Sequence, residues 1–262
     1  MRALNIAATG MLSQQTNVEV ISNNIANLNT TAFKRQRAEF RDLLYQNARR
    51  VGATSSDAGT IVPSGIQLGS GVRTAATYRI QEQGTITVTD NTLDLAVNGK
   101  GYFVVNVPGR AEPTYTRAGS FQLDATGTIV TADGYPIAGP DAVPQNAVDI
   151  TVNANGQVFV KVDGQAEPVP AGQIQLVNFQ NESGLQAIGD NMYERTPASG
   201  EAIEGNPGAE GFGRIIQGAV ESSNVNVVAE ITNLITAQRA YEMNSKVIST
   251  TDQMLNTVNQ LR

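Results

Sequence analysis

The side chains in this sequence that could do acid–base chemistry are carboxylates. Asp94, Asp124, Asp133 and Glu194 are the candidates, because a pair of such groups can supply the general acid and base of a hydrolase. The chain contains no histidine and no cysteine. That composition removes the commonest general base and any Cys-based metal or redox site. Each candidate carboxylate stands beside a turn or a strand, where local hydrogen bonding or solvation accounts for it.

Phosphate-binding chemistry is also poorly represented. The stretch Asn98–Phe103, NGKGYF, lacks the spaced glycine and the Ser or Thr that a phosphate-cradling loop requires. We therefore expect a protein that is not an enzyme, with no catalytic residue, no cofactor and no metal ion. An extracellular carboxylate-based hydrolase is the alternative from another functional class, and a glycosidase assay would distinguish the two.

The most unusual stretch is EVISNNIANLNTTAFK, Glu19–Lys34, because it concentrates asparagine in a helical pattern. A helix that faces water normally carries Glu, Lys and Arg on its outer face, and Asn is a mediocre helix former. Residues 1–33 contain only Arg2 and Glu19 as charges. Amides can donate and accept across an interface without the desolvation cost of an unpaired charge. This pattern favours protein neighbours on several sides; an ordinary intramolecular helical hairpin with a polar exterior is the alternative.

Both ends of the chain predict long helices with a coiled-coil-like seam. Leu4, Met11, Val18 and Ile25 recur at seven residues, followed three residues later by Ala7, Ile21 and Leu28, with Gln14 as the exception. Val227, Leu234, Tyr241, Ile248 and Leu255 recur in the same way. Such a repeat is typical of helices that pair through one apolar stripe. We expect an N-terminal helix over about Leu4–Leu28, a C-terminal helix over most of residues 222–262, and the two helices paired.

The middle of the chain has a residue pattern typical of β-strands joined by turns. All ten prolines lie between Pro63 and Pro207, and short alternating apolar runs are separated by turn dipeptides. These dipeptides begin at Asn98, Thr126, Asp133, Asn155 and Asp163, each followed by glycine. Such turns between alternating runs favour hairpins. The predicted class is α+β: paired N- and C-terminal coiled-coil-like helices with an inserted all-β domain.

The segment between the first helix and the β domain is basic. Residues 34–50 carry six basic and two acidic side chains, whereas residues 51–224 carry eight basic and eighteen acidic ones. The basic run lacks the aromatic interleaving typical of single-strand binding, so we expect a solvated face and no nucleic acid. Phe33, Phe40, Leu43 and Leu44 favour a short helix over residues 33–50. Residues 51–75 read as extended or loop-like.

No apolar run approaches the eighteen residues of a membrane span, and no secretory signal is recognisable at the N-terminus. We expect no membrane insertion and, if the chain leaves the cytoplasm, export by another route. The predicted domains are a terminal helical polymerisation domain (residues 1–33 plus 222–262), a connector (34–75, short helix plus extended loop) and an all-β outer domain (76–221).

Two long motifs resemble a known family. Ile21–Phe40, ISNNIANLNTTAFKRQRAEF, is similar to the N-terminal signature of the bacterial flagellar axial proteins, which form the rod, hook and hook-associated segments. Ser222–Leu255 is similar to their C-terminal signature. Pro63–Arg73, Leu93–Val105 and Tyr115–Pro136 most resemble the distal-rod members. A proximal rod protein of similar length is the nearest alternative, and the hook protein generally has a larger central region.

This resemblance implies a structural subunit of the distal rod, the rigid drive shaft that transmits torque to the hook across the periplasm and outer membrane. It implies helical polymerisation of the chain with itself, with the paired helices forming the inner tube and the β domain outside. The implied partners are proximal rod and hook proteins at the ends, the surrounding P and L ring proteins, and the flagellar type III export apparatus. The stretch of residues 42–75 is implied to lock neighbouring subunits.

The resemblance is carried by particular positions. Those that match the family signatures are Ser22–Lys34, Ser223–Val225, Gln238–Glu242, Asn244 and Asp252–Leu255. Combining the signatures with the seam pattern gives the predicted assembly interface. Its residues are Leu4, Ala7, Met11, Val18, Ile21, Asn24, Ile25, Asn27 and Leu28, together with Leu234, Tyr241, Ile248, Leu255 and Val258.

Overall fold

Helices at the two ends of the chain flank a β-rich region, so the predicted α+β class is confirmed. The computed structural model describes residues 2–49, 64–110, 112–165 and 167–260. The chain divides into two compact units. Unit 1 comprises Met1–Ala26, Gln36–Tyr78 and Asn226–Arg262, and unit 2 comprises Asn27–Arg35 and Arg79–Val225.

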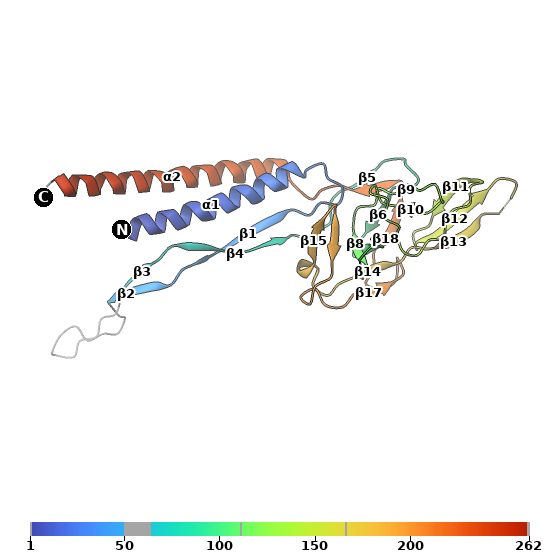
Figure 1. Ribbon diagram of the computed structural model, residues 1–262, viewed down its shortest axis with the longest axis horizontal. Coiled ribbons are helices and arrows are strands. Elements are labelled where there is room, and N and C mark those ends of the chain that lie inside the picture. Colours follow the sequence, from blue (N-terminus) through green and yellow to red (C-terminus); the bar gives the residue numbers. More distant parts are fainter. Residues whose placement is uncertain (1, 50–63, 111, 166, 261–262) are drawn as a thin grey trace. The chain divides into compact units, whose positions relative to one another are not determined.

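Unit 1 is built on the two terminal helices, α1 (Arg2–Ala26) and α2 (Val227–Gln260), which lie in contact in Figure 1. Helix α2 begins at an N-cap, since the Asn226 side-chain oxygen accepts a hydrogen bond from Ala229 N at 3.1 Å. This bond satisfies one of the amides that a helix start leaves unpaired. The sequence from Val227 to Gln260 contains no Gly or Pro, so nothing in it interrupts the helix.

Helix α1 ends two residues before the predicted boundary at Leu28. Asn27 lies in the turn that follows, where its side-chain oxygen accepts a hydrogen bond from the Thr30 hydroxyl at 3.1 Å. Thr30 N also donates to Asn27 O at 3.3 Å. Asparagine side chains compete with helical hydrogen bonds in this way. The turn therefore removes Asn27 and Leu28 from the helix.

A ribbon of paired strands completes unit 1. Its strands are β1 (Gln36–Asp42), β2 (Tyr45–Arg49), β3 (Ile66–Gly69) and β4 (Val72–Arg79). Strand β1 pairs with β4, and β2 pairs antiparallel with β3. The residues of β1 alternate between half-buried and exposed from Gln36 to Arg41, and the strand contacts α1.

The predicted helix over residues 33–50 is wrong, because this segment forms β1 and β2. The spacing of Phe33, Phe40, Leu43 and Leu44 is compatible with one face of a helix. Along β1, however, half-buried and exposed residues alternate one by one. Ala38 and Phe40 are half-buried, while the charged residues between and beside them are exposed. A strand with this alternation buries one face of the ribbon, and β1 contacts α1. Of the unassigned stretch 51–75, residues 51–63 lie outside the described part of the chain, and the remainder contributes β3 and the start of β4.

Unit 2 contains the remaining strands. They are β5 (Ile86–Val88), β6 (Leu95–Asn98), β7 (Tyr102–Val105), β8 (Thr114–Thr116), β9 (Gln122–Leu123), β10 (Ile129–Val130), β11 (Ala147–Val152), β12 (Gln157–Val162), β13 (Val169–Gln173), β14 (Leu176–Asn178), β15 (Gln186–Gly189), β16 (Met192–Glu194), β17 (Ile203–Gly205), β18 (Arg214–Gln217) and β19 (Ala219–Glu221). A short 3-10 helix spans Glu182–Gly184. The largest sheet has the order β15-β16-β8-β7-β14-β17, and β11-β12-β13 forms a second sheet. The pairs β9–β10, β6–β18 and β5–β19 are two-stranded.

The turn dipeptides predicted the hairpins correctly at three positions. Thr126-Gly127 joins β9 to β10, Asn155-Gly156 joins β11 to β12, and Asp163-Gly164 joins β12 to β13. Asp133-Gly134 closes only an isolated bridge between Val130 and Pro136. Asn98-Gly99 forms no hairpin, because β6 pairs with β18 whereas β7 joins the six-stranded sheet.

The six-stranded sheet has an apolar cluster on each face. Phe103 belongs to one cluster, where its ring meets that of Phe121 edge-on at 5.1 Å. Its neighbour Tyr102 belongs to the other, with Tyr193 and Phe179 around it. Successive side chains of a strand point to opposite faces, so β7 serves both clusters. The six-stranded sheet is therefore packed against apolar side chains on both faces.

Candidate assembly interface

One continuous stripe of α2 is buried or half-buried, and the rest of the helix is exposed. The stripe consists of Val227, Glu230, Leu234, Ala237, Ala240, Asn244, Ile248, Thr251 and Leu255. Consecutive members are three or four residues apart, as in a helix that packs along a single partner helix. Helix α1 is that partner, and the pairing expected between the two ends of the chain is present.

Two contacts define the register between the helices. A Cβ atom built on Gly10 would lie 2.9 Å from Asn244 Nδ2, so the α1 backbone approaches α2 closely at this point. Nearer the other end of the pair, Asn24 Nδ2 donates to Glu230 Oε2 at 3.3 Å. The two contacts are equally far apart in sequence on both helices. The antiparallel register is therefore constant along the pair.

Helix α1 is also covered on a second side by the ribbon. Thr9 Oγ1 accepts a hydrogen bond from Val72 N at 3.4 Å, and a Cβ on Gly71 would collide with that hydroxyl. Gly71 also has a positive φ of 115°, a backbone conformation that suits glycine. The polar residues Ser13 and Asn24 are among the most buried of α1. Part of the unusual polarity of α1 therefore serves contacts within one chain.

Asn24 is the centre of these intramolecular contacts. Its side chain is 1% exposed. Its oxygen accepts from Gln36 N at 2.8 Å, and its nitrogen donates to Gln36 O at 2.9 Å as well as to Glu230. The amide thus pairs with the backbone of β1 as a neighbouring strand would. A buried amide with every hydrogen-bonding group satisfied fixes the position of its neighbours.

The residues of the predicted interface occupy different environments. Ala7, Ile21 and Asn24 are buried, and Leu4, Met11, Val18 and Ile25 are half-buried on α1. Leu234, Ile248 and Leu255 lie in the half-buried stripe of α2. Tyr241 is 40% exposed and Val258 60% exposed. Asn27 and Leu28 are half-buried in unit 2, beyond the end of α1.

The exposed surface of α2 carries many apolar side chains. They are Val228, Ile231, Ile235, Tyr241, Met243, Val247, Met254 and Val258, with exposed fractions between 40% and 76%. The ribbon shows the same feature around Leu44, Tyr45, Ile66 and Leu68. Tyr241, which the seven-residue repeat places in the seam, lies among these exposed residues and outside the stripe that faces α1. Apolar groups at this density are typical of surfaces that bind protein.

Sequence reasoning missed a buried charged cluster in unit 2. Glu221 accepts hydrogen bonds from Lys34 Nζ at 2.5 Å and from Arg117 Nε at 2.7 Å. It also accepts from Gly84 N at 2.8 Å, and the three side chains are at most 6% exposed. Burial alone would raise the pKa of Glu221, but Arg117 and Lys34 hold that pKa below its ordinary value. The cluster ties the segment after α1 to the strand before α2.

A second amide supports the same region of unit 2. The Asn224 side chain accepts from Arg35 N at 2.7 Å and donates to Ile80 O and Glu82 O, both at 2.9 Å. Lys34 and Asn224 both lie in stretches that match the axial-protein signatures. That position in the signatures is the one sequence signal that could have identified them, because local patterns do not reveal contacts this distant in the chain.

Three of the four candidate carboxylates form hydrogen bonds or an ion pair within unit 2. Asp94 accepts from Thr89 and Asn91 in a turn, and Asp124 accepts from Ala125 N and the Thr126 hydroxyl. Glu194 forms an ion pair with Arg110 at 3.0 Å. Asp133 is exposed in a turn. Interactions of this kind are what turn and surface carboxylates ordinarily make.

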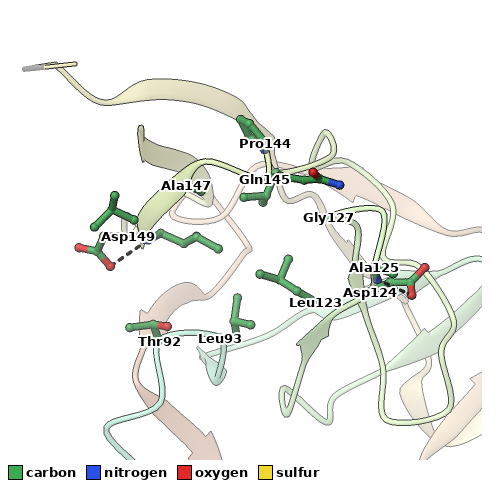
Figure 2. Close-up of a pocket in the computed structure, with 13 residues that line it drawn as sticks. Thr92, Leu93, Leu123, Asp124, Ala125, Gly127, Pro144, Gln145, Ala147 and Asp149 are labelled. Carbon is green, nitrogen blue, oxygen red and sulfur yellow. Dashed lines mark hydrogen bonds between the residues drawn. The ribbon is translucent and has the colours of Figure 1, made fainter. Parts of the chain in front are cut away.

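An open cavity of about 600 Å³ in unit 2 offers no evident chemistry (Figure 2). Leu93, Leu123 and Ile150 supply apolar walls. Its two carboxylates are turned to nearby backbone, with Asp124 accepting from Ala125 N at 2.6 Å and Asp149 from Ile150 N at 2.9 Å. Across the described residues, no cluster of three or more His, Asp or Glu side chains could hold a metal ion. None of the described helices is both long and apolar enough to cross a bilayer.

Three sequence families match this chain, at its two ends and in its middle. Residues 4–34 match "Flagella basal body rod protein", and residues 216–261 match "Flagellar basal body rod FlgEFG protein C-terminal". Residues 96–160 match "Flagellar hook protein FlgE/F/G D1 domain". The two terminal matches cover most of α1 and all of α2, and the third covers part of unit 2.

Full-length relatives agree with these matches. The flagellar basal-body rod protein FlgG of Caulobacter vibrioides is 59% identical over the whole length of both chains. FlgG of Buchnera aphidicola from Acyrthosiphon pisum is 50% identical, with 99% of each chain covered. FlgG of Agrobacterium fabrum is 48% identical at the same coverage. Identity at this level along the entire length extends to both helices, the ribbon and unit 2, and the chain belongs to the flagellar basal-body rod protein family.

Proposed function

We propose that this chain is a structural subunit of the distal rod of the bacterial flagellum, which polymerises helically into a stiff tube. Its nearly full-length identity to rod proteins named FlgG carries this proposal. The unusual terminal helices support it, because their exposed surfaces are apolar or amide-rich with few charges. Such a surface is suited to burial by further protein.

The physical basis of assembly would be the exposed face of α2. A helical polymer requires heterologous contacts, in which one surface of a subunit binds a different surface of the next copy. Burying a large apolar side chain such as Ile231, Ile235 or Met243 contributes roughly 1.5–3 kcal/mol. Several such side chains on every subunit, repeated along the rod, would hold torque without covalent links. The coiled-coil-like pair α1–α2 would present them.

The two units would have different roles in the assembled rod. Unit 1 would form the polymerisation core, with the seam residues Leu4, Met11, Val18, Ile248 and Leu255 holding the helix pair together. The strands of unit 2 would lie outside it. The exposed apolar end of the ribbon, formed by β2 and β3, would lock onto a neighbouring subunit, since a lone two-stranded ribbon is marginally stable in water.

The partners follow from the place of such a subunit in the flagellum. Proximal rod proteins would meet one end of the polymer and the hook protein the other, with P and L ring proteins around it. The subunit would reach its site through the flagellar export apparatus. We assign no reaction and no cofactor to this chain.

The test is assembly in cells. In a strain lacking its own distal rod protein, the wild-type chain should restore rods and hooks, visible by electron microscopy of purified basal bodies. Ile248→Asp places a charge in the helix seam and should abolish rod assembly while leaving the near-ultraviolet circular dichroism of unit 2 unchanged. Ser249→Asp adds the same charge at the adjacent exposed position and serves as the control.

The location of the subunit separates distal from proximal rod. An antibody label on the chain should decorate the part of the rod next to the hook. Label confined to the cell-proximal part, or to the hook itself, would contradict the distal assignment. Normal rods from the Ile248→Asp variant would contradict the seam mechanism.

A further inference from the structure

The covalent chain passes repeatedly between unit 1 and unit 2. These passages follow Ala26, Arg35, Tyr78 and Val225. The residues of unit 2 next to the passages form three short stretches, 27–35, 79–85 and 219–225, which we call the first, second and third crossing stretches. Any force that passes along the chain from one unit to the other is therefore applied to unit 2 at these stretches.

Each crossing stretch is hydrogen-bonded to the other two. Ala32 N in the first stretch donates to Glu221 O in the third at 2.7 Å. Ile80 N in the second stretch donates to Arg35 O in the first at 2.9 Å. Gly84 N in the second stretch donates to the Glu221 carboxylate in the third at 2.8 Å. A pull on one stretch is therefore opposed by bonds to both of the others.

The charged cluster of Lys34, Arg117 and Glu221 joins the crossing stretches to the six-stranded sheet. Lys34 Nζ, in the first stretch, donates to Glu82 O in the second at 2.9 Å and to Glu221 in the third. Arg117 binds Glu221 and also donates to Gly101 O at 2.7 Å, directly before β7. The three charged side chains are buried. Charged hydrogen bonds are stronger in such a site than in water, because the local dielectric constant is low.

The first crossing stretch is also held in a strained conformation. Ala32 has a positive φ of 57° and is 2% exposed. An alanine rarely adopts this left-handed conformation, which persists only where the surrounding contacts over-determine it. Beside the bond from Ala32 N to Glu221 O, Asn224 N donates to Phe33 O at 3.3 Å. The contacts between the first and third stretches thus fix the backbone at this point.

We propose that the charged cluster is a mechanical anchor, which keeps unit 2 folded when force passes along the chain between the two units. The inference rests on the proposed function and deepens it, because a subunit of a drive shaft that transmits torque must withstand such force. Bonds that are loaded together share the force, whereas bonds that are loaded one after another break at a lower force. Glu221 is bonded to the first and second stretches and, through Arg117, to the sheet, so a pull on any crossing stretch loads these bonds together.

The test is single-molecule force spectroscopy of the full chain, pulled along two directions. The sequence has no cysteine, so two introduced thiols define where the force is applied. Ala8→Cys and Ser249→Cys, at exposed positions of α1 and α2, pull unit 2 through its crossing stretches. Ala132→Cys and Gln165→Cys, at exposed positions within unit 2, pull it without loading those stretches. The rupture of unit 2 is identified in each case by the length of chain that it releases.

The expected result is an effect that depends on the direction of pulling. At a fixed force, Glu221→Gln should unfold unit 2 roughly tenfold faster or more than the wild type when pulled through the crossing stretches, and less than about twofold faster when pulled within unit 2. Lys34→Met keeps the ion pair between Glu221 and Arg117 and should show the same directional effect, so it serves as the second variant where Glu221→Gln folds poorly. Glu194→Gln, which breaks a half-exposed ion pair with Arg110, is the matched control and should unfold at the wild-type rate in both directions.

The dependence on direction separates a mechanical role from a purely stabilising one. Equal acceleration in both directions would overturn the proposal, because the cluster would then support unit 2 as a whole and not its crossing stretches. Wild-type rates in the first direction for both cluster variants would overturn it as well. Neither result would affect the proposed function, which is contradicted instead if the wild-type chain fails to restore rods.

Discussion

At the scale of single residues, buried polar side chains determine the backbone path near the ends of both helices. Asn24 binds both backbone groups of Gln36 in unit 1, and Asn224 binds Arg35 N in unit 2. The two amides therefore hold consecutive peptide groups of one short stretch. Glu221 likewise accepts hydrogen bonds from two cationic side chains and one backbone amide. These residues act within the subunit, so their loss should change local structure before it changes assembly.

Replacing Asn24 tests its role at the start of β1. Asn24→Ala leaves Gln36 N and Gln36 O without their partner in a buried site, which costs on the order of 1–3 kcal/mol. The amide hydrogen of Gln36 should exchange with solvent roughly 10–100 times faster in this variant, measured by hydrogen-exchange mass spectrometry or NMR. Asn29→Ala, at an exposed turn position, should leave that rate unchanged; equal effects of both would contradict the assignment.

Replacing Glu221 tests the charged cluster. Glu221→Gln leaves Lys34 and Arg117 buried without their counter-charge, which typically costs about 3–5 kcal/mol. The unfolding transition of unit 2, followed by the near-ultraviolet signal of its tyrosines, should move to lower temperature or lower denaturant concentration. Glu194→Gln, which breaks a half-exposed ion pair, should change stability by less than about 1 kcal/mol. A small effect of Glu221→Gln would show that the cluster is not a main support of unit 2.

The pH dependence of the same transition has a definite sign. The pKa of Glu221 is lower in the folded chain than the ordinary value, so its contribution is fully present above the unfolded pKa of about 4.3. That contribution is lost as the pH falls through the lower folded pKa. Stability of unit 2 should therefore decline below about pH 5, and Glu221→Gln should decline less steeply over that range. Parallel pH curves for the two proteins would contradict this linkage.

At the scale of elements, the helix pair depends on close approach at a glycine. The atom nearest a Cβ on Gly10 belongs to the flexible end of the Asn244 side chain, which can move by a few tenths of an ångström. A longer side chain at this position would push the helices apart, whereas alanine would gain helix propensity of roughly 0.5–1 kcal/mol. The glycine therefore serves the packing of α1 against α2.

Substitutions at Gly10 separate these two effects. Gly10→Ala should leave the thermal stability of the helix signal unchanged or slightly raised, and Gly10→Leu should lower it by about 1–3 kcal/mol through overpacking. Ala8→Leu, at an exposed position of α1, is the matched control and should have little effect. Circular dichroism at 222 nm measures all three, and a destabilised Gly10→Ala would show that the contact is tighter than its geometry indicates.

At the scale of the whole molecule, each unit is assembled from segments that are distant in sequence. Unit 2 includes the short stretch Asn27–Arg35, which supplies Lys34 to the cluster around Glu221. Unit 1 takes its two helices from opposite ends of the chain. A deletion that ends at Ala26 should therefore affect unit 1, whereas a deletion that extends through Arg35 should also affect unit 2.

Two deletions test this organisation. Removing residues 2–26 eliminates α1 and should prevent rod assembly, but unit 2 keeps Lys34 and should unfold at the wild-type temperature. Removing residues 2–35 also eliminates Lys34 and should lower the stability of unit 2 by several kcal/mol. Differential scanning calorimetry of the two fragments provides the measurement. Identical transitions for unit 2 would contradict a stabilising role for the stretch Asn27–Arg35.

The sequence by itself determined the features that repeat locally. The seven-residue spacing of Leu234, Ile248 and Leu255 was enough for α2, and glycine-containing turns were enough for three hairpins, because both signals involve residues close in the chain. The same reasoning gave a wrong prediction at Phe40, which was expected in a helix and lies in strand β1. Only the contacts of β1 with α1 and β4 favour a strand over a helix at this position.

Only the tertiary structure decided which polar groups meet and which apolar groups stay exposed. The sequence could place Lys34 and Glu221 on opposite sides of the β region, but their ion pair depends on how that region folds between them. It could place Val258 among the predicted interface residues, but its exposure follows from where α1 begins relative to α2. Contacts between distant segments depend on the register of whole elements, and local residue patterns do not encode that register.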